Sequence, residues 1–190
     1  MAPPTETSPH SSKLTYEDYV TLPDDGRRYE ILDGELAVSP SPSSAHQRVS
    51  ENLGGLLYTW VKTHRLGRIW RAPLDLILAD TVVVQPDIMY VSPERASIVT
   101  DRGIEGAPDL VVEILSRSTG RRDRGAKKRI YARHGVGRYW LVDPEACTLE
   151  IFALREGKHE QVAAHAGNMV VAVDVPPGLE FPLAELWATD

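Results

Sequence analysis

The spacing of apolar residues predicts a long amphipathic helix over about residues 45–64. Apolar side chains recur there at helical intervals and form one stripe: Val49, Leu53, Leu56, Leu57 and Trp60. Ser44 is expected to cap the N-terminus of this helix, because a serine hydroxyl accepts a hydrogen bond from a free backbone N–H. Gly54 and Gly55, in its middle, weaken the helix locally and leave room for close packing on a sheet.

Two smaller elements are predicted before this helix. Residues 15–22 begin with the side-chain spacing of a capping box, which indicates a short helix. A β-hairpin is expected next, because Asp33-Gly34 is a typical two-residue turn and lies between the alternating segments 29–32 and 35–38.

Runs of apolar and β-branched residues predict several further strands. They cover residues 68–78, 81–91, 109–115, 139–142, 148–154, 159–164 and 169–175. The runs 109–115 and 139–142 are the most apolar, as expected of buried central strands. The loop 92–108 is expected to contain a helical turn around residues 93–98, and a second helix is predicted from residue 119 to residue 134.

From residue 45 to residue 142 the predicted order is therefore helix, three strands, helix, strand. This order indicates the α/β (α+β) class, with a mixed sheet flanked by helices and extra antiparallel strands at both ends. With 190 residues the chain is long enough for one domain with a sizeable core, which we place at residues 13–190.

Composition and the single cysteine bear on the compartment. No apolar run reaches the roughly 20 residues that a membrane-spanning helix needs. Residues 1–12 have neither the charged nor the apolar region of a signal peptide and are predicted to be a disordered leader. Cys147 is the only cysteine, so it cannot form an internal disulfide, and we interpret it as a structural thiol. These features favour a cytoplasmic protein.

Charge is unevenly distributed along the chain. The net charge is -6, yet residues 117–133 contain eight basic residues and one acid, while the remaining residues carry 13 basic and 26 acidic side chains. A basic helix on an acidic body can offer a local positive ridge to a phosphate backbone. A solvated helix rich in Arg and Lys explains the same charge equally well.

Two acidic residues interrupt apolar strands and are the strongest candidates for chemistry. Asp87 follows Pro86 within the strand 81–91, and Glu113 lies within the strand 109–115. A buried carboxylate needs a partner, because Asp and Glu are almost never fully buried unpaired. Two such acids on neighbouring strands could bind one Mg²⁺ or Mn²⁺ ion. The alternatives are a capping role for Asp87 and a salt bridge from Glu113, at a strand end, to an arginine.

The helical wheel of residues 119–134 selects one lysine. At 100° per residue, Lys127 shares a face with Asp123 and the large apolar residues Ile130 and Tyr131, whereas Lys128 points away from it. Lys127 is therefore expected to face the sheet, where it could orient a water molecule or stabilise developing charge. Its stem could instead pack on the sheet while its ammonium group reaches solvent.

Two further residues are candidates for the same site. His46 lies on the apolar stripe near the N-terminus of the long helix, where it could bind a metal ion or a phosphate. A lone histidine on an apolar face is, however, more often a core residue with satisfied hydrogen bonds. Glu30, in the first strand of the hairpin, could be a third carboxylate of the site or an exposed residue of an edge strand.

The sequence contains none of the motifs that indicate other common enzyme classes. It has no P-loop, no GxGxxG, no HExxH, no CxxC and no GxSxG motif. Nucleotide triphosphate use, zinc proteolysis and serine hydrolysis therefore lack their usual support.

Several segments together resemble the Uma family (Uma-two) of restriction-endonuclease-like proteins over about residues 14–186. The segments that carry the resemblance are YEILDGEL at 29–36, SPSP at 39–42 followed by His46, QPD at 85–87, GAPDLVVEILS at 106–116, Arg122-Asp123 followed by Lys127 and Tyr131, and GV at 135–136 through YWLVDP at 139–144.

The resemblance implies a PD-(D/E)xK nuclease fold with an α-β-β-β-α-β core. Pro86-Asp87 matches the PD element and Glu113 the acidic position of (D/E)xK. The lysine of that motif would be residue 115, which is Leu115 here. Related families move this lysine to the following helix, and Lys127 is the residue that such a move selects.

The expected function is hydrolysis of phosphodiester bonds of nucleic acid, with DNA as the expected substrate. Asp87 and Glu113 would bind Mg²⁺ or Mn²⁺, Lys127 would assist, and three arginines would bind the backbone: Arg121, Arg122 and Arg124. Cleavage of both strands would favour a homodimer. The alternative is a catalytically inactive nuclease-like module that binds nucleic acid or a protein partner.

Overall fold

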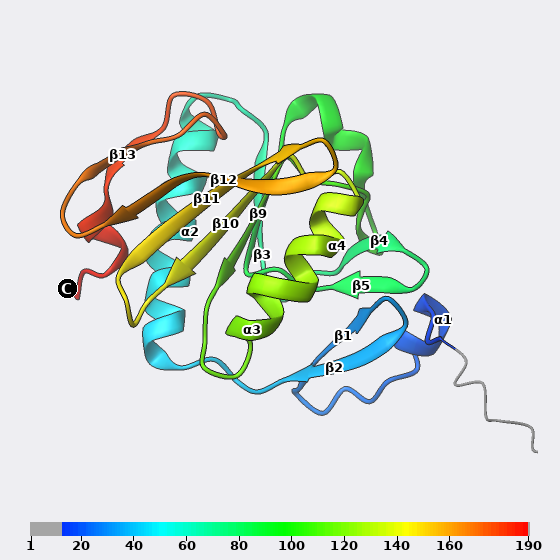
Figure 1. The fold of residues 1–190 in the computed structure, drawn as a ribbon. Coiled ribbons are helices and arrows are strands. Elements are labelled where there is room, and N and C mark those ends of the chain that lie inside the picture. Colours follow the sequence, from blue (N-terminus) through cyan, green and yellow to red (C-terminus); the bar gives the residue numbers. More distant parts are fainter. Residues whose placement is uncertain (1–12, 190) are drawn as a thin grey trace, which may run out of the picture.

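The structure is a computed structural model, and it describes residues 13–189. The leader predicted for residues 1–12 lies outside the described residues. Two six-stranded mixed sheets make up most of the fold, together with a two-stranded antiparallel sheet and a few helices (Figure 1). The mixed α/β class predicted from the sequence is thus confirmed.

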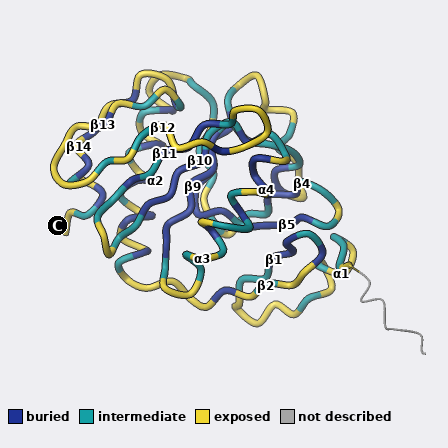
Figure 2. The backbone as a smooth tube through the Cα atoms, viewed as in Figure 1, coloured by how far each residue is buried: buried dark blue, intermediate teal, exposed yellow. Residues whose placement is uncertain are grey.

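The larger part of the core is built on one sheet, which we call the central sheet. Its strands lie in the order β12 (Lys158–Ala166), β11 (Thr148–Arg155), β10 (Arg138–Asp143), β9 (Leu110–Ile114), β6 (Ile88–Val91) and β3 (Arg68–Arg71). β9 pairs in parallel with β10 and antiparallel with β6, so it lies in the middle of the sheet as predicted. Figure 2 shows β9 and β10 as buried strands.

The second sheet contains the N-terminal hairpin. Its strands lie in the order β2 (Glu35–Ser39), β1 (Arg28–Leu32), β5 (Val82–Val84), β4 (Leu76–Ala79), β8 (Gly103–Glu105) and β7 (Val99–Thr100). The hairpin forms as predicted, with Asp33 and Gly34 both at positive φ in its turn. The expected extra strands at the N-terminal end therefore belong to a separate sheet rather than to an extension of the central one.

The prediction of two long strands at 68–78 and 81–91 was wrong, because each run is divided between the two sheets. The first run forms β3 and β4, and the second forms β5 and β6. A proline lies at each division: Pro73 between β3 and β4, and Pro86 between β5 and β6. Proline lacks a backbone N–H, so it cannot donate to a ladder, and the chain changes sheets there.

The long helix α2 (Ser44–Thr63) buries the predicted stripe on one face of the central sheet. Val49, Leu53 and Leu57 are buried against residues of β6, β9 and β10. Its N-cap is Ser43 rather than Ser44, and the Ser43 hydroxyl accepts a hydrogen bond from the backbone N–H of His46 at 3.2 Å.

The predicted second helix covers the other face of the central sheet (Figure 1). It consists of three consecutive segments: α3 (Gly120–Arg122), the π-helical η2 (Asp123–Lys127) and α4 (Lys128–Arg133). Gly135, at φ 85°, follows its end, where glycine commonly terminates a helix. Taking only the central sheet and its helices, the order from α2 to β10 is helix, three strands, helix, strand.

The remaining elements are short. They are α1 (Tyr16–Tyr19), the 3-10 helices η1 (Pro93–Ile98) and η3 (Leu183–Leu186), and the pair β13 (Val170–Ala172) and β14 (Glu180–Pro182). The helix near residue 15 and the turn at 93–98 were predicted. Strands β7, β8 and β14 were not, because two or three residues carry too little periodicity. In the described part of the chain, no helix combines the length and apolar character needed to cross a membrane.

Candidate active site

The register of the central sheet places Asp87 beside Glu113. Ile88 of β6 pairs with Val112 of antiparallel β9, so the residues one step further along each strand, Asp87 and Glu113, face each other. Side chains alternate along a strand, and both acids lie on the face that carries Val111 and the second helix. Only 3% of Asp87 and 2% of Glu113 is exposed.

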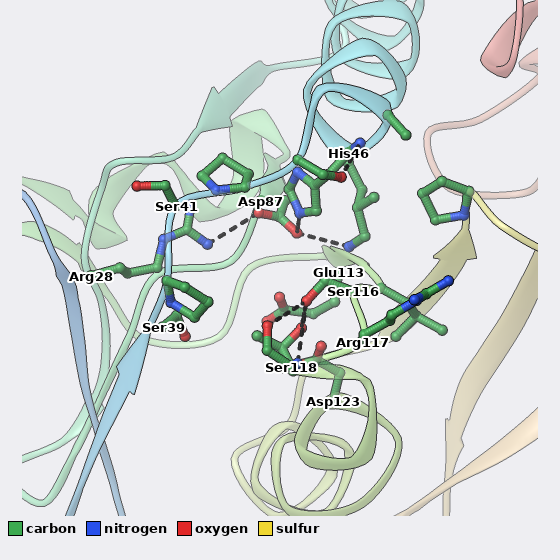
Figure 3. Close-up of a pocket in the computed structure, with 18 of the residues that line it drawn as sticks. Arg28, Ser39, Ser41, His46, Asp87, Glu113, Ser116, Arg117, Ser118 and Asp123 are labelled. Carbon is green, nitrogen blue, oxygen red and sulfur yellow. Dashed lines mark hydrogen bonds and ion pairs between the residues drawn. The ribbon is translucent and has the colours of Figure 1, made fainter.

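Asp87 is held by three donors at the end of the sheet. Arg28 Nη1 lies 3.1 Å from its Oδ1, while Oδ2 accepts a hydrogen bond from the backbone N–H of Ile114 at 2.8 Å and lies 3.2 Å from His46 Nε2. Figure 3 shows Arg28 and His46 pointing toward this carboxylate. Burial alone would raise the pKa of Asp87, but His46, Arg28 and the Ile114 amide outweigh it and lower the pKa below its usual value.

Glu113 lies in a more apolar and more crowded position. Its Oε1 accepts hydrogen bonds from Lys127 Nζ at 2.9 Å and from the Tyr131 hydroxyl at 2.6 Å. Burial raises the pKa of Glu113 to about 8, and the neighbouring carboxylates of Asp123 and Asp87 add to this effect, although Lys127 opposes it.

Lys127 is the centre of the acidic cluster. Its Nζ lies 2.8 Å from Glu30 Oε1 and 2.9 Å from Glu113 Oε1, with Asp123 Oδ1 at 3.8 Å. Burial lowers the pKa of Lys127, but the surrounding carboxylates outweigh burial and raise it, so the ammonium group keeps its proton.

The prediction that Lys127, and not Lys128, faces the sheet is confirmed. Lys127 is buried, whereas Lys128 is partly exposed and places its Nζ 3.8 Å from the centroid of the Phe152 ring. The π-helical segment turns Asp123 and Lys127 toward the sheet together. The catalytic role of Lys127 stays a prediction.

Glu30 belongs to the same cluster and is fully buried. Its strand β1 lies between β2 and β5, so the alternative of an exposed edge-strand residue was wrong. Glu30 Oε1 accepts a hydrogen bond from the Gln85 backbone N–H at 2.9 Å, and its Oε2 lies 3.6 Å from Arg122 Nη1.

Three residues of the cluster were not assigned a role from the sequence: Arg28, Asp123 and Tyr131. The helical wheel had already placed Asp123 and Tyr131 on the buried face with Lys127. Arg28 could have been found by strand alternation, because it is two residues before Glu30 on β1 and therefore on the same face.

The arginines predicted to bind a nucleic-acid backbone differ in their surroundings. Arg122 points inward and donates a hydrogen bond to Ser39 Oγ at 3.1 Å. Arg124 forms ion pairs with Glu150 at 2.5 Å and Asp143 at 3.8 Å. Arg121 is exposed. Contact of these residues with nucleic acid stays a prediction.

The cluster opens into a cavity of about 400 Å³. Asp87, Glu113 and Lys127 line it, and we call the other lining residues at 39–43, 116–119 and 144–145 its rim. Figure 3 shows Asp87 and Glu113 together with Ser39, Ser41, Ser116 and Ser118 of the rim. Because the rim is rich in Ser and Thr hydroxyl groups, it can donate hydrogen bonds to a polar substrate.

Carboxylate oxygens of the cluster could hold a divalent cation. Four buried acids (Glu30, Asp87, Glu113 and Asp123) face the cations of Arg28, Arg122 and Lys127. Within the described residues, Glu30 Oε2 and Asp123 Oδ1 are buried without a hydrogen-bond partner. Among residues 13–189 no group of three or more His, Cys, Asp or Glu side chains is arranged to hold a metal. Mg²⁺ can bind with so few protein ligands, because it commonly keeps several water ligands and uses only one or two carboxylates.

Comparison with solved structures identifies the class of fold. A crystal structure from Anabaena variabilis, described as a putative nuclease belonging to DUF820, is similar with a TM-score of 0.76. The match covers 92% of this chain and 97% of that one, at 21% sequence identity, and therefore shows a shared mixed α/β fold.

The model of the Uma2 family, described as "Putative restriction endonuclease", matches residues 16–184. The chain belongs to the Uma2 family, as the sequence resemblance indicated. No curated protein matches it.

Proposed function

We propose that this protein is a metal-dependent endonuclease that hydrolyses phosphodiester bonds of nucleic acid, with DNA as the first candidate substrate. The observation that carries the proposal is the pairing of Asp87 and Glu113 on adjacent strands, with Lys127 2.9 Å from Glu113, at the bottom of one cavity. Family membership and the helix, three strands, helix, strand order of the central sheet support a PD-(D/E)xK core.

The position of Leu115 supports the move of the lysine to the helix. Leu115 is buried among the apolar residues between the central sheet and the second helix, on the same face as Glu113. Leu115 also lines the site cavity, so the position of the usual lysine contributes only an apolar side chain to it. Lys127 reaches the same carboxylate from the helix, so the cavity has an ammonium group without one on the strand.

Each residue of the site has a role that follows from its surroundings. Asp87 and Glu113 would hold Mg²⁺ or Mn²⁺, which when bound would polarise a phosphoryl oxygen and lower the pKa of a water ligand. Lys127 keeps its proton, so it would orient the attacking water and donate to the developing negative charge rather than act as a base. His46 and Arg28 would hold the Asp87 carboxylate in position.

One observation favours the rival function, a catalytically inactive module that binds nucleic acid or a protein partner. Arg28 and His46 already contact the two oxygens of Asp87, so a cation that binds this carboxylate must compete with them. Arg28 can move more easily, because 26% of its side chain is exposed compared with 10% for His46.

A cleavage assay tests the proposed function. Supercoiled plasmid, single-stranded DNA and RNA are incubated with the protein and Mg²⁺ or Mn²⁺, beside Asp87→Ala and Lys127→Ala, with Lys128→Ala as the matched control. We expect metal-dependent cleavage that falls by roughly 100-fold or more in the first two variants, the scale for loss of one essential group, and little in the third. Cleavage that persists in Asp87→Ala would refute the site. Intact metal binding without cleavage of any substrate would favour the inactive module.

A further inference from the structure

A second basic surface lies away from the basic helix. Residues 58–74 contain four basic side chains and no acidic one, in a chain whose net charge is -6. The four residues, which we call the β3 basic surface, are Lys62, Arg65, Arg68 and Arg71. They extend from the C-terminal end of α2 along β3, which pairs with β6 and is the edge strand of the central sheet as described.

The charges of this surface are not neutralised by the protein. All four side chains are exposed, and within residues 13–189 none of them forms an ion pair with a carboxylate. Arg122 and Arg124 of the basic helix both have acidic neighbours. The β3 basic surface is therefore more available to an external anion than these two arginines are.

The surface is connected to the candidate active site. A hollow of about 410 Å³ shares Arg28, His46 and Asp87 with the site cavity and extends to Arg71 and Pro73. Two more hollows lie against β3 beyond Arg71. Both are lined by Arg65, Gly67, Arg68 and Trp70.

Gly54 of α2 keeps the side chain of Arg71 beside this path. A Cβ atom at residue 54 would lie 2.9 Å from Arg71 Nε, so any other residue there would require the Arg71 side chain to shift. An aromatic side chain is also present: Tyr58, which is 51% exposed, lines one of the hollows along β3. Exposed aromatic rings beside a positive groove are the elements with which proteins bind single-stranded nucleic acid.

We propose that the β3 basic surface binds the phosphate backbone of the nucleic acid whose scissile bond lies at Asp87 and Glu113. This inference rests on the proposed function and adds a substrate path along α2 and β3. A symmetric second copy of the chain fits less well, because pairing two β3 edges would bring Arg68 and Arg71 against like charges.

Binding measured without catalysis tests the path. Fluorescence anisotropy of labelled single-stranded and duplex DNA is recorded in EDTA over a range of salt concentrations. The test variant is Arg68→Ala/Arg71→Ala. The control with the same charge change is Arg155→Ala/Lys158→Ala, on the hairpin at the opposite edge of the central sheet. A second matched pair, Lys62→Glu and Lys158→Glu, serves if the test variant does not fold.

We expect Arg68→Ala/Arg71→Ala to weaken binding by about tenfold or more and to reduce the slope of log affinity against log salt by roughly 1.4–1.8, since each lost phosphate contact accounts for 0.7–0.9. The control should change affinity by less than about twofold. If the test and control variants bind DNA with equal affinity, the proposed path is wrong. The path is also wrong if light scattering shows a dimer that dissociates only in the Arg68→Ala/Arg71→Ala variant. If Arg68→Ala/Arg71→Ala weakens DNA binding but the wild-type protein cuts no substrate, the path is supported and the proposed nuclease activity is refuted.

Discussion

At the scale of single residues, the site concentrates negative charge that the protein only partly neutralises. Glu113 shares Lys127 with Glu30, and Asp123 lies at the edge of the same contact. Because desolvation penalises each ionised carboxyl group, one response is to retain a proton, and this is what the raised pKa of Glu113 describes. Binding of a divalent cation would be another response to the same charge.

The substitution Lys127→Met tests this charge balance through stability. Above pH 8 Glu113 is ionised, so removing the lysine leaves buried carboxylates uncompensated and should cost about 3–5 kcal/mol of unfolding free energy. At pH 6, below the raised pKa, Glu113 retains its proton and the loss should be smaller. Urea unfolding at pH 6 and pH 9 measures the difference, with Lys128→Met as the control. A loss that is equal at the two pH values would contradict the balance described here.

A residue of the site could be predicted from the sequence only where a short-range pattern of neighbouring residues marks it. Asp87, Glu113 and Lys127 were found because an acid in an apolar strand and a lysine on an apolar helix face break a short-range pattern. The alternative of a salt bridge from Glu113 to an arginine was wrong in its partner, because Glu113 pairs with Lys127. Arg28 contacts Asp87, which is 59 residues away in sequence, and no short-range pattern contains that contact.

At the scale of elements, α2 contributes one face to the hydrophobic core and lies beside β3 along the proposed nucleic-acid path. The adjacent glycines in its middle face different surroundings. A Cβ at Gly55 would meet nothing within 4 Å, whereas one at Gly54 would collide with the Arg71 side chain. The sequence predicted close packing for both residues, and the structure supports it only for Gly54.

The two glycines give a matched prediction. Gly55→Ala should stabilise the protein by about 0.5–1 kcal/mol, because alanine favours the helix and fits without contact. Gly54→Ala should gain less, because Arg71 must move to make room. Thermal unfolding of the two variants measures this, and DNA anisotropy should show weaker binding for Gly54→Ala alone. A larger stabilisation from Gly54→Ala than from Gly55→Ala would contradict the packing.

The second helix shows why element type is easier to predict than element detail. Its approximate boundaries were predicted from the sequence, and its buried face followed from the spacing of its apolar residues. The π-helical segment Asp123–Lys127 did not, because one wider turn leaves the apolar spacing almost unchanged.

At the scale of the whole molecule, the site lies where the two sheets and both long helical segments meet. Glu30 comes from β1 of the second sheet, Glu113 from β9 of the central sheet, and Lys127 from the helix between them. Local pattern predicted most of these elements but not their division into two sheets. That division depends on pairings such as Ile31 with Val83, which join residues far apart in sequence.

The position of a bound metal ion tests the central claim most directly. Crystals grown with Mn²⁺ and measured at its absorption edge should show an anomalous peak bound by the carboxylates of Asp87 and Glu113, with Arg28 displaced from Asp87 Oδ1. Asp87→Ala crystals of the same form should lack it. A wild-type structure at saturating Mn²⁺ in which Arg28 remains on Asp87 and no ion contacts either acid would contradict the claim.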